Sequence, residues 1–266
     1  MVEGLEFSLL VGISVGLSAG YLGSIMVLEK MALVGDALSH VALPGLALGI
    51  LFNFPPLLGG FAFLFASSII IWEVGKATRL SFETIVGAVF TLSLAIGVLM
   101  IEDLEVLGEA LFGSIANVTL ADAVTGVVIA IAAVYLTRII YNKVVLSMIS
   151  EELAISEGVN VGRVNLLFLL LISLVVAIGI KITGTLLVGF LVVVPAAAAK
   201  NLSANLRRYS ILSSLFGAVS ALVGILAAGL VSYLEHPPPP GPLVVVAGVV
   251  LFAVTVVIRW KKRLSV

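Results

Sequence analysis

The chain consists mostly of long apolar runs, and this feature limits the folds that it can adopt. At a rise of about 1.5 Å per residue, a helix needs about 20 apolar residues to cross the hydrocarbon core of a bilayer. Runs of about this length predict nine membrane spans, at about 5–28, 31–51, 55–75, 84–101, 119–141, 164–180, 182–199, 209–232 and 242–259. A shorter apolar piece, from Val106 to Ile115, is too brief to cross and is expected to lie at the surface or to re-enter the membrane.

The composition supports a helical membrane protein. Of the 266 residues, 61% are hydrophobic and 11% are charged, whereas soluble domains average about 45–50% and about 25%. The apolar residues form unbroken runs instead of alternating with polar ones, which argues against a β-barrel. We therefore predict an all-α, polytopic membrane protein with about eight or nine transmembrane helices, forming a single transmembrane domain over residues 1–266.

Charge and cysteine content exclude other classes. The net charge is −1, and the sequence has neither a basic stripe nor an aromatic platform, so we expect no binding of nucleic acid. Cysteine is absent. Any metal ligand must therefore be a carboxylate, an imidazole or an oxygen dipole. No stretch reads GxxxxGK[ST], so ATP bound to this polypeptide is not expected to drive transport.

The basic residues predict the orientation of the chain. With nine spans and an external N-terminus, all 14 Lys and Arg residues except Lys181 fall on one side of the membrane. Because cytoplasmic loops are enriched in Lys and Arg, we expect this side, with the C-terminus, to be cytoplasmic in a plasma or inner membrane. The outer side collects acidic residues, which would concentrate cations at its mouth: Glu3, Glu6, Glu102, Asp103, Glu105, Glu109 and Glu235.

Two ionisable residues lie within the second apolar run. Asp36 and His40 are four residues apart, so on a helix both side chains project from one face. A charged group at the centre of a bilayer costs about 2.5–3.5 kcal/mol, so it needs a partner, a cavity or a passing ion. Pro44 has no N–H and frees the carbonyl of His40. The cluster is suited to a cation site, although an Asp–His pair can also join helices structurally.

Two series of glycines predict close packing between helices. Gly12, Gly16 and Gly20 form a GxxxGxxxG ladder in the first span, and Gly45 and Gly49 repeat the spacing after the Asp–His pair. Small residues with this period allow helix backbones to approach each other closely.

The longest polar segment on the expected cytoplasmic side covers about 147–165. Ser150 is predicted to cap a short helix with Glu151 and Glu152 in its first turn, where the helix dipole favours acids. An apolar edge and two helix-breaking glycines follow: Leu153, Ile155 and Val159, then Gly158 and Gly162. These residues are compatible with a solvated loop or with a helix that docks on a cytosolic partner.

Several segments, in order along the chain, closely resemble the ABC-3 family, the membrane permease subunits of zinc, manganese and iron uptake systems. The first is Gly35–His40, followed by Leu43–Gly45. The others are Arg79–Leu80 through Glu83–Thr84 and Gly87, Asp103–Leu104 with Leu111–Gly113, Gly184–Val188 through Pro195–Ala197, and Ser232–Tyr233 with Gly241–Pro242. The chain departs from the family pattern in having Ala197 within the "PATA" run and Glu83 where Asp is common.

This resemblance implies the fold of the vitamin B12 and siderophore importer permeases. It also implies a homodimer that docks a separate cytosolic ATPase and receives metal from an extracytoplasmic binding protein. The permease itself would be no enzyme and would hold no permanent cofactor, since the divalent metal is its substrate. The segment from Glu151 to about Gly162, with Glu152, Leu153 and Gly158, would be the element that couples to the ATPase. Asp36 and His40 would line the metal path, with the two copies facing each other near the dimer axis.

Two other functions remain open from the residues. A proton-driven secondary transporter would also use an Asp–His pair, and it would work without ATP. A permease for a metal chelate would need a wide aromatic path, but aromatic residues make up 8% of the chain and do not cluster around Asp36. No HExxH motif or nucleophile constellation points to an enzyme. The ligand types suit zinc, manganese and iron alike.

Overall fold

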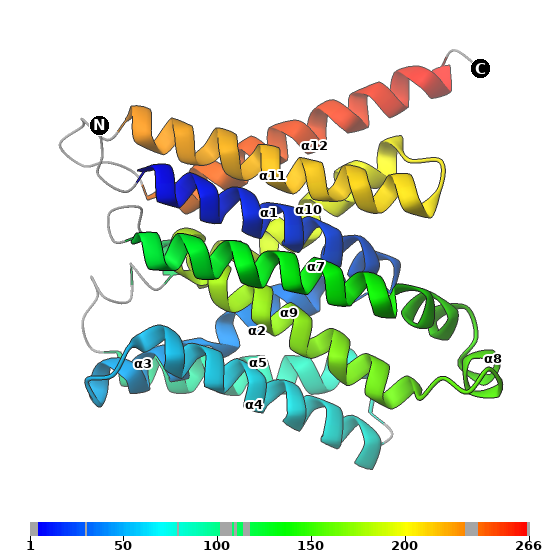
Figure 1. Ribbon diagram of the computed structural model, residues 1–266, viewed down its shortest axis with the longest axis horizontal. Helices are drawn as coiled ribbons and strands as arrows, with labels where there is room; N and C mark the ends of the chain where they lie inside the picture. The colour runs from blue at the N-terminus through cyan, green and yellow to red at the C-terminus, as the bar shows by residue number, and fades with distance from the viewer. Residues whose placement is uncertain are drawn as a thin grey trace.

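The computed structural model describes residues 5–29, 31–78, 80–101, 108, 111–113, 118–231 and 239–264, and the regular elements in these ranges are α-helices. The helices are α1 (Leu5–Leu28), α2 (Ala32–Val41), α3 (Leu43–Leu51), α4 (Pro56–Ala77), α5 (Phe82–Met100), α7 (Leu120–Ile149), α8 (Glu151–Ser156), α9 (Val161–Thr183), α10 (Thr185–Leu202), α11 (Leu206–Leu230) and α12 (Pro240–Leu264). Most run side by side as one bundle, and the short helix α8 lies at one end (Figure 1).

The prediction of an all-α membrane protein with about eight or nine spans is confirmed. Eight helical stretches are long and apolar enough to cross a membrane, and Val188–Leu202 within α10 is a shorter apolar helix. Helices suit this role because each satisfies its backbone hydrogen bonds internally, away from water. Most of the apolar piece from Val106 to Ile115, and the motif residues Arg79, Asp103, Leu104, Ser232 and Tyr233, lie outside the described residues.

Three predicted spans differ in detail. The span at 31–51 is divided into α2 and α3 at Ala42, two residues before Pro44, which cannot donate a backbone hydrogen bond. Helix α7 continues to Ile149 and has 30 residues. Its length of about 45 Å exceeds the hydrocarbon core of about 30 Å, so α7 extends beyond the bilayer. The span at 182–199 is shifted to Thr185–Leu202, because Gly184 with φ 74° ends α9.

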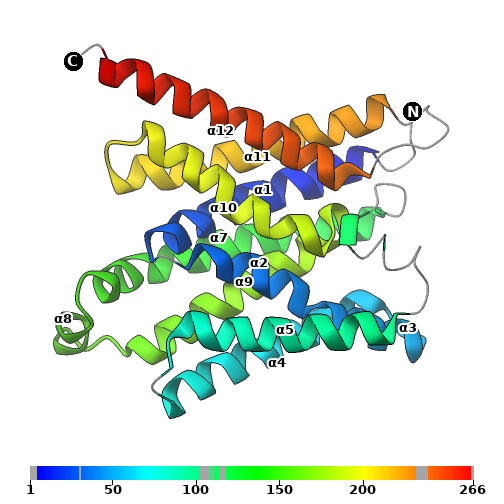
Figure 2. The same cartoon turned by 180° about the vertical axis from the view of Figure 1, so that it is seen from behind.

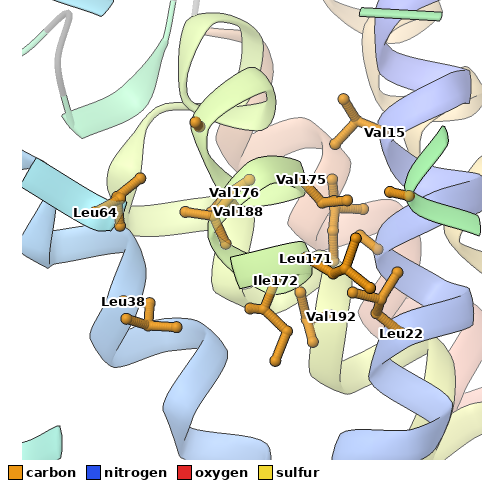
Figure 3. Close-up of a cluster of buried hydrophobic side chains, with 14 of the residues drawn as sticks. Val15, Leu22, Leu38, Leu64, Leu171, Ile172, Val175, Val176, Val188 and Val192 are labelled. Atoms are coloured by element: carbon orange, nitrogen blue, oxygen red, sulfur yellow. The ribbon is translucent and has the colours of Figure 1, made fainter. Parts of the chain in front are cut away.

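The core is built from branched apolar side chains of α1, α2, α4, α9 and α10. Helix α9 supplies several of them, and side chains from the other four helices lie near it (Figure 3). The labelled members are Val15 and Leu22 of α1, Leu38 of α2, Leu64 of α4, Leu171, Ile172, Val175 and Val176 of α9, and Val188 and Val192 of α10, and all are buried. In this packing α2 lies against α10 and also contacts α9.

The first glycine series lies against α11. A Cβ at Gly16 would overlap the backbone carbonyl of Gly217, and one at Gly20 would overlap that of Ser213. Gly12 faces Ile225. The Ser214 hydroxyl also donates to the Leu17 carbonyl at 2.7 Å. The close approach of the two backbones leaves no room for a side chain at Gly16 or Gly20.

The second glycine series lies at the contact between α3 and α4. A Cβ at Gly45 would overlap the carbonyl of Gly59, and one at Gly49 would overlap the Cα of Pro56. The α2–α3 segment is therefore held on one side by a tight α3–α4 contact.

The helix ends that bear most of the described basic residues gather at one end of the bundle, together with α8 (Figure 1). These residues are Lys76 on α4, Lys143 on α7, Arg163 on α9, Lys200 on α10, Arg207 and Arg208 on α11, and Arg259, Lys261 and Lys262 on α12. The bundle thus has one strongly basic end.

Candidate metal site

The Asp–His pair lies on α2, one helical turn apart and on one face, as the spacing predicts. Asp36 and His40 are both half-buried. Figure 2 shows α2 on the face of the bundle where α10 and α5 are also seen. Both of these helices contact α2. The carboxylate lies near enough to interact electrostatically with the imidazole.

Asp36 is placed by close contact with α10. A Cβ built at Gly189 would overlap the Asp36 Cα and would lie 2.8 Å from its Oδ1. The Ser39 hydroxyl donates to the Asp36 backbone carbonyl at 2.6 Å, which holds this turn of α2 together. The absence of a side chain at Gly189 therefore gives the Asp36 carboxylate its room.

His40 lies beside an aromatic ring of α5 and keeps one nitrogen without a partner. Its ring centroid is 5.4 Å from that of Phe90, with the ring planes tilted by 57°. Its Nδ1 is buried and has no hydrogen-bond partner among the described residues. Leaving a buried polar group unpaired costs about 1–3 kcal/mol, so such an atom calls for an explanation. A bound ion would be one explanation. A neutral imidazole nitrogen is a common metal ligand.

The candidate metal site is incomplete within one chain. Within the described ranges, no group of three or more His, Cys, Asp or Glu side chains is close enough together to hold an ion. Zinc sites usually have about four ligands. To bind zinc, Asp36 and His40 would therefore need further ligands from outside this set.

Gly189→Ala tests whether the room beside Asp36 matters. The added methyl group must displace Asp36 or α10. On the prediction that Asp36 and His40 line a metal path, we expect metal uptake by proteoliposomes to fall by about tenfold or more, as small misplacements of functional groups can cost this much or more. Gly87→Ala is the matched control, because a Cβ at Gly87 meets nothing within 4 Å. Full uptake in Gly189→Ala would contradict the placement.

The segment at 147–165 contains the predicted short helix. Helix α8 begins at Glu151, and the Ser150 hydroxyl accepts from the Leu153 N–H at 3.1 Å, which confirms the predicted cap. Gly158, with φ +75°, follows the helix end. The prediction that Gly162 also breaks a helix is wrong. Gly162 lies in the first turn of α9, and its carbonyl accepts from the Trp72 Nε1–H at 2.7 Å.

Helix α8 is anchored by one residue and exposes the others. Ala154 is buried, whereas Leu153 and Ile155 are 47% and 59% exposed. Glu151 and Glu152 are also exposed in the first turn. A short helix with acidic and apolar side chains facing outward is available for contact with another protein.

A cavity of about 320 Å³ lies between α8 and the bundle, and sequence reasoning missed it. It is lined by Glu29 after the end of α1, by Ser147 of α7, by Glu151 of α8 and by Asn165 of α9, among others. Burial raises the pKa of the Glu29 carboxyl to about 7. Glu29, which precedes the Asp–His pair in the chain, and Glu151 of α8 thus line the same cavity.

The model of the ABC 3 transport family matches residues 1–259. The manganese transport system membrane protein MntC of Listeria monocytogenes is 30% identical over 251 residues, covering 93% of this chain and 88% of the relative. The zinc uptake membrane protein ZnuB of Buchnera aphidicola is 30% identical over 226 residues, covering 83% and 86%. The structure of PsaBC from Streptococcus pneumoniae in complex with Fab matches with a TM-score of 0.81 and 28% identity, covering 95% of this chain and 91% of the other.

Proposed function

Since the chain belongs to the ABC 3 transport family, we propose that it is the membrane permease subunit of an ATP-driven importer of divalent zinc, manganese or iron. The similarity to MntC and to ZnuB supports transport of a divalent transition metal. ATP hydrolysis is assigned to a separate cytosolic ATPase, since this sequence has no Walker A motif.

The observation that carries this proposal is the half-buried pair on α2. Asp36 and His40 share a face of a helix that packs within a membrane bundle, and the His40 Nδ1 is unpartnered among the described residues. In a homodimer, two such pairs facing each other across the symmetry axis would offer two carboxylates and two imidazoles. This set suits zinc, manganese or iron better than it suits calcium or magnesium.

The basic end of the bundle supports the predicted orientation. Cytoplasmic loops are rich in Lys and Arg, and the helix ends with most of the described basic residues lie together with α8 (Figure 1). We place this end and the C-terminus in the cytoplasm. The ATPase then docks on α8 through Leu153, Ile155 and the two acids before them. A solute-binding protein delivers the metal at the opposite end.

The proposed mechanism is alternating access. Closure of the ATPase pair moves α8, and the bundle changes from open outward to open inward around the Asp–His pairs. The ligands bind the ion in transit only, because conduction requires binding that is weak enough for release. The metal is thus the substrate that passes between the ligands.

Reconstitution tests this function and identifies the metal. The chain, with its ATPase and binding protein, is placed in proteoliposomes, and uptake of zinc, manganese and iron is measured with and without ATP. We expect ATP-dependent uptake of at least one of the three metals in the absence of an ion gradient. Uptake that needs a proton gradient and persists without ATP would contradict the proposal and favour a secondary transporter.

A further inference from the structure

A second site lies between α1, α7 and α11. We propose that the chain binds an anionic phospholipid there, with the lipid phosphate held by Arg138 and Arg207 and an acyl chain in the adjoining apolar groove. The inference is independent of the proposed function, because none of the residues involved belongs to the Asp–His pair or to α8.

The polar part of the site is a cavity of about 500 Å³ with positive charge. Its polar lining residues are Tyr21 of α1, Arg138, Tyr141 and Asn142 of α7, and Arg207 and Ser210 of α11. No carboxylate is among the described residues that line it. The cavity therefore presents two guanidinium groups with no lining acid to neutralise them, and it attracts an anion.

Hydrogen-bond donors surround these two arginines. Arg138 lies beside the Tyr21 hydroxyl. The hydroxyl of Tyr141 is buried and lacks a hydrogen-bond partner among the described residues, so it remains able to donate to a ligand. Arg207 lies in the first turn of α11, where the helix dipole favours a negative charge. Arginine and hydroxyl donors match the oxygen atoms of a phosphate group.

The apolar part of the site identifies the ligand as a lipid. A groove of about 410 Å³ lies between α1, α7 and α11, the three helices that also bound the polar cavity, and Arg138 lines both hollows. Its apolar walls include Leu17, Ile131, Val134 and Tyr135, and Ile131 and Tyr135 are each 64% exposed. Free phosphate makes no favourable contact with such an apolar groove, whereas an acyl chain would fill it. The junction at Arg138 thus fits an amphipathic molecule.

The depth of the site agrees with a lipid headgroup. Arg138 lies eleven residues before the end of α7 at Ile149, which corresponds to about 17 Å along a helix that is longer than the bilayer core. Arg207 lies in the first turn of α11, and this end of α11 is at the basic end of the bundle. Basic pockets between membrane helices at one bilayer surface bind anionic headgroups. Helices α1, α7 and α11 are in front in Figure 1, whereas α2 and α5 are in front in Figure 2, which is the view from behind. The proposed lipid site therefore lies on the face of the bundle opposite to α2 and α5.

The first test measures which lipid stays bound to the full chain. The protein is exchanged into vesicles with equal amounts of phosphatidylglycerol and phosphatidylcholine, and retained lipid is measured by native mass spectrometry. We expect retention of phosphatidylglycerol in the wild type. Retention should be about tenfold lower in Arg138→Gln and in Arg207→Gln, because each loses a charge-assisted hydrogen bond. Arg208→Gln is the matched control, since Arg208 is exposed on the same helix turn and does not line the cavity.

Three results would overturn the proposal. These are equal retention of the two lipids by the wild type, undiminished retention in the double variant of Arg138 and Arg207, and a loss in Arg208→Gln as large as in Arg207→Gln. Val134→Trp fills the groove without changing charge, so it should also lower retention of the lipid.

The second test needs no variant. Thermal unfolding of the wild-type protein in detergent is compared after addition of phosphatidylglycerol, phosphatidylcholine or inorganic phosphate. We expect phosphatidylglycerol to raise the unfolding temperature, and phosphatidylcholine and inorganic phosphate to leave it unchanged. A ligand that binds only the folded state stabilises that state. Equal stabilisation by inorganic phosphate would identify free phosphate as the ligand and would overturn the lipid assignment.

Discussion

Asp36→Asn or His40→Ala is expected to reduce metal uptake to background, while the complex still assembles in the membrane. Asn keeps the shape of the side chain at Asp36 but removes the charge that balances a divalent cation, and Ala at His40 removes the imidazole ligand. In a homodimer each substitution acts twice, so two of the four proposed ligands are lost. Uptake of radioactive or isotopically labelled metal by proteoliposomes, with co-purification of the ATPase as the assembly check, gives the result.

Ser68→Ala is the matched control for a buried polar group elsewhere in the bundle. The Ser68 hydroxyl lies 2.7 Å from that of Ser173, between α4 and α9. Its loss is expected to lower the free energy of unfolding by about 1 kcal/mol and to leave uptake near the wild-type level. Unimpaired accumulation in both Asp36→Asn and His40→Ala would rule out the proposed metal path.

The double substitution Glu151→Lys and Glu152→Lys is expected to uncouple ATP hydrolysis from transport. It reverses the charge of the exposed first turn of α8, where the helix dipole also disfavours cations. A docked ATPase would then meet a surface of the wrong charge. The measured quantity is the number of metal ions imported per ATP hydrolysed in proteoliposomes, and we expect it to fall by about tenfold or more, a typical range for a lost charge-assisted contact.

Glu73→Lys separates this effect from a general change of charge at the basic end. Glu73 is exposed on α4 and pairs with Lys76 at 3.1 Å, so its reversal breaks a surface ion pair that contributes little to stability. We expect coupling to survive in this variant. If the α8 double variant keeps wild-type coupling and still co-purifies with the ATPase, α8 is not the docking element.

Two prolines show what the sequence alone can and cannot predict about the helices. Pro44 and Pro195 both lack an N–H, and Pro44 was expected to free the carbonyl of His40. The chain divides into α2 and α3 near Pro44, whereas α10 continues through Pro195. The missing donor is a local property, but whether the helix divides depends on neighbouring helices, which local sequence does not specify.

Prediction was more complete for the local parts of the site than for its surroundings. The shared face of Asp36 and His40 follows from helix periodicity, and the cap at Ser150 follows from its side chain. Gly189 and Phe90, which place the pair, come from α10 and α5. Their approach results from tertiary packing, and each appears in the sequence as one small or aromatic residue in an apolar run.

X-ray absorption at the zinc edge of the assembled complex examines the proposed coordination itself. The complex without nucleotide is equilibrated with zinc, and the spectrum of His40→Ala is subtracted from that of the wild type. The proposed site predicts a difference shell of imidazole nitrogens at about 2.0–2.1 Å, with carboxylate oxygens at about 2.0–2.2 Å that disappear in Asp36→Asn. An imidazole shell that is unchanged in His40→Ala would show that the metal binds elsewhere and would contradict a path between the two Asp–His pairs.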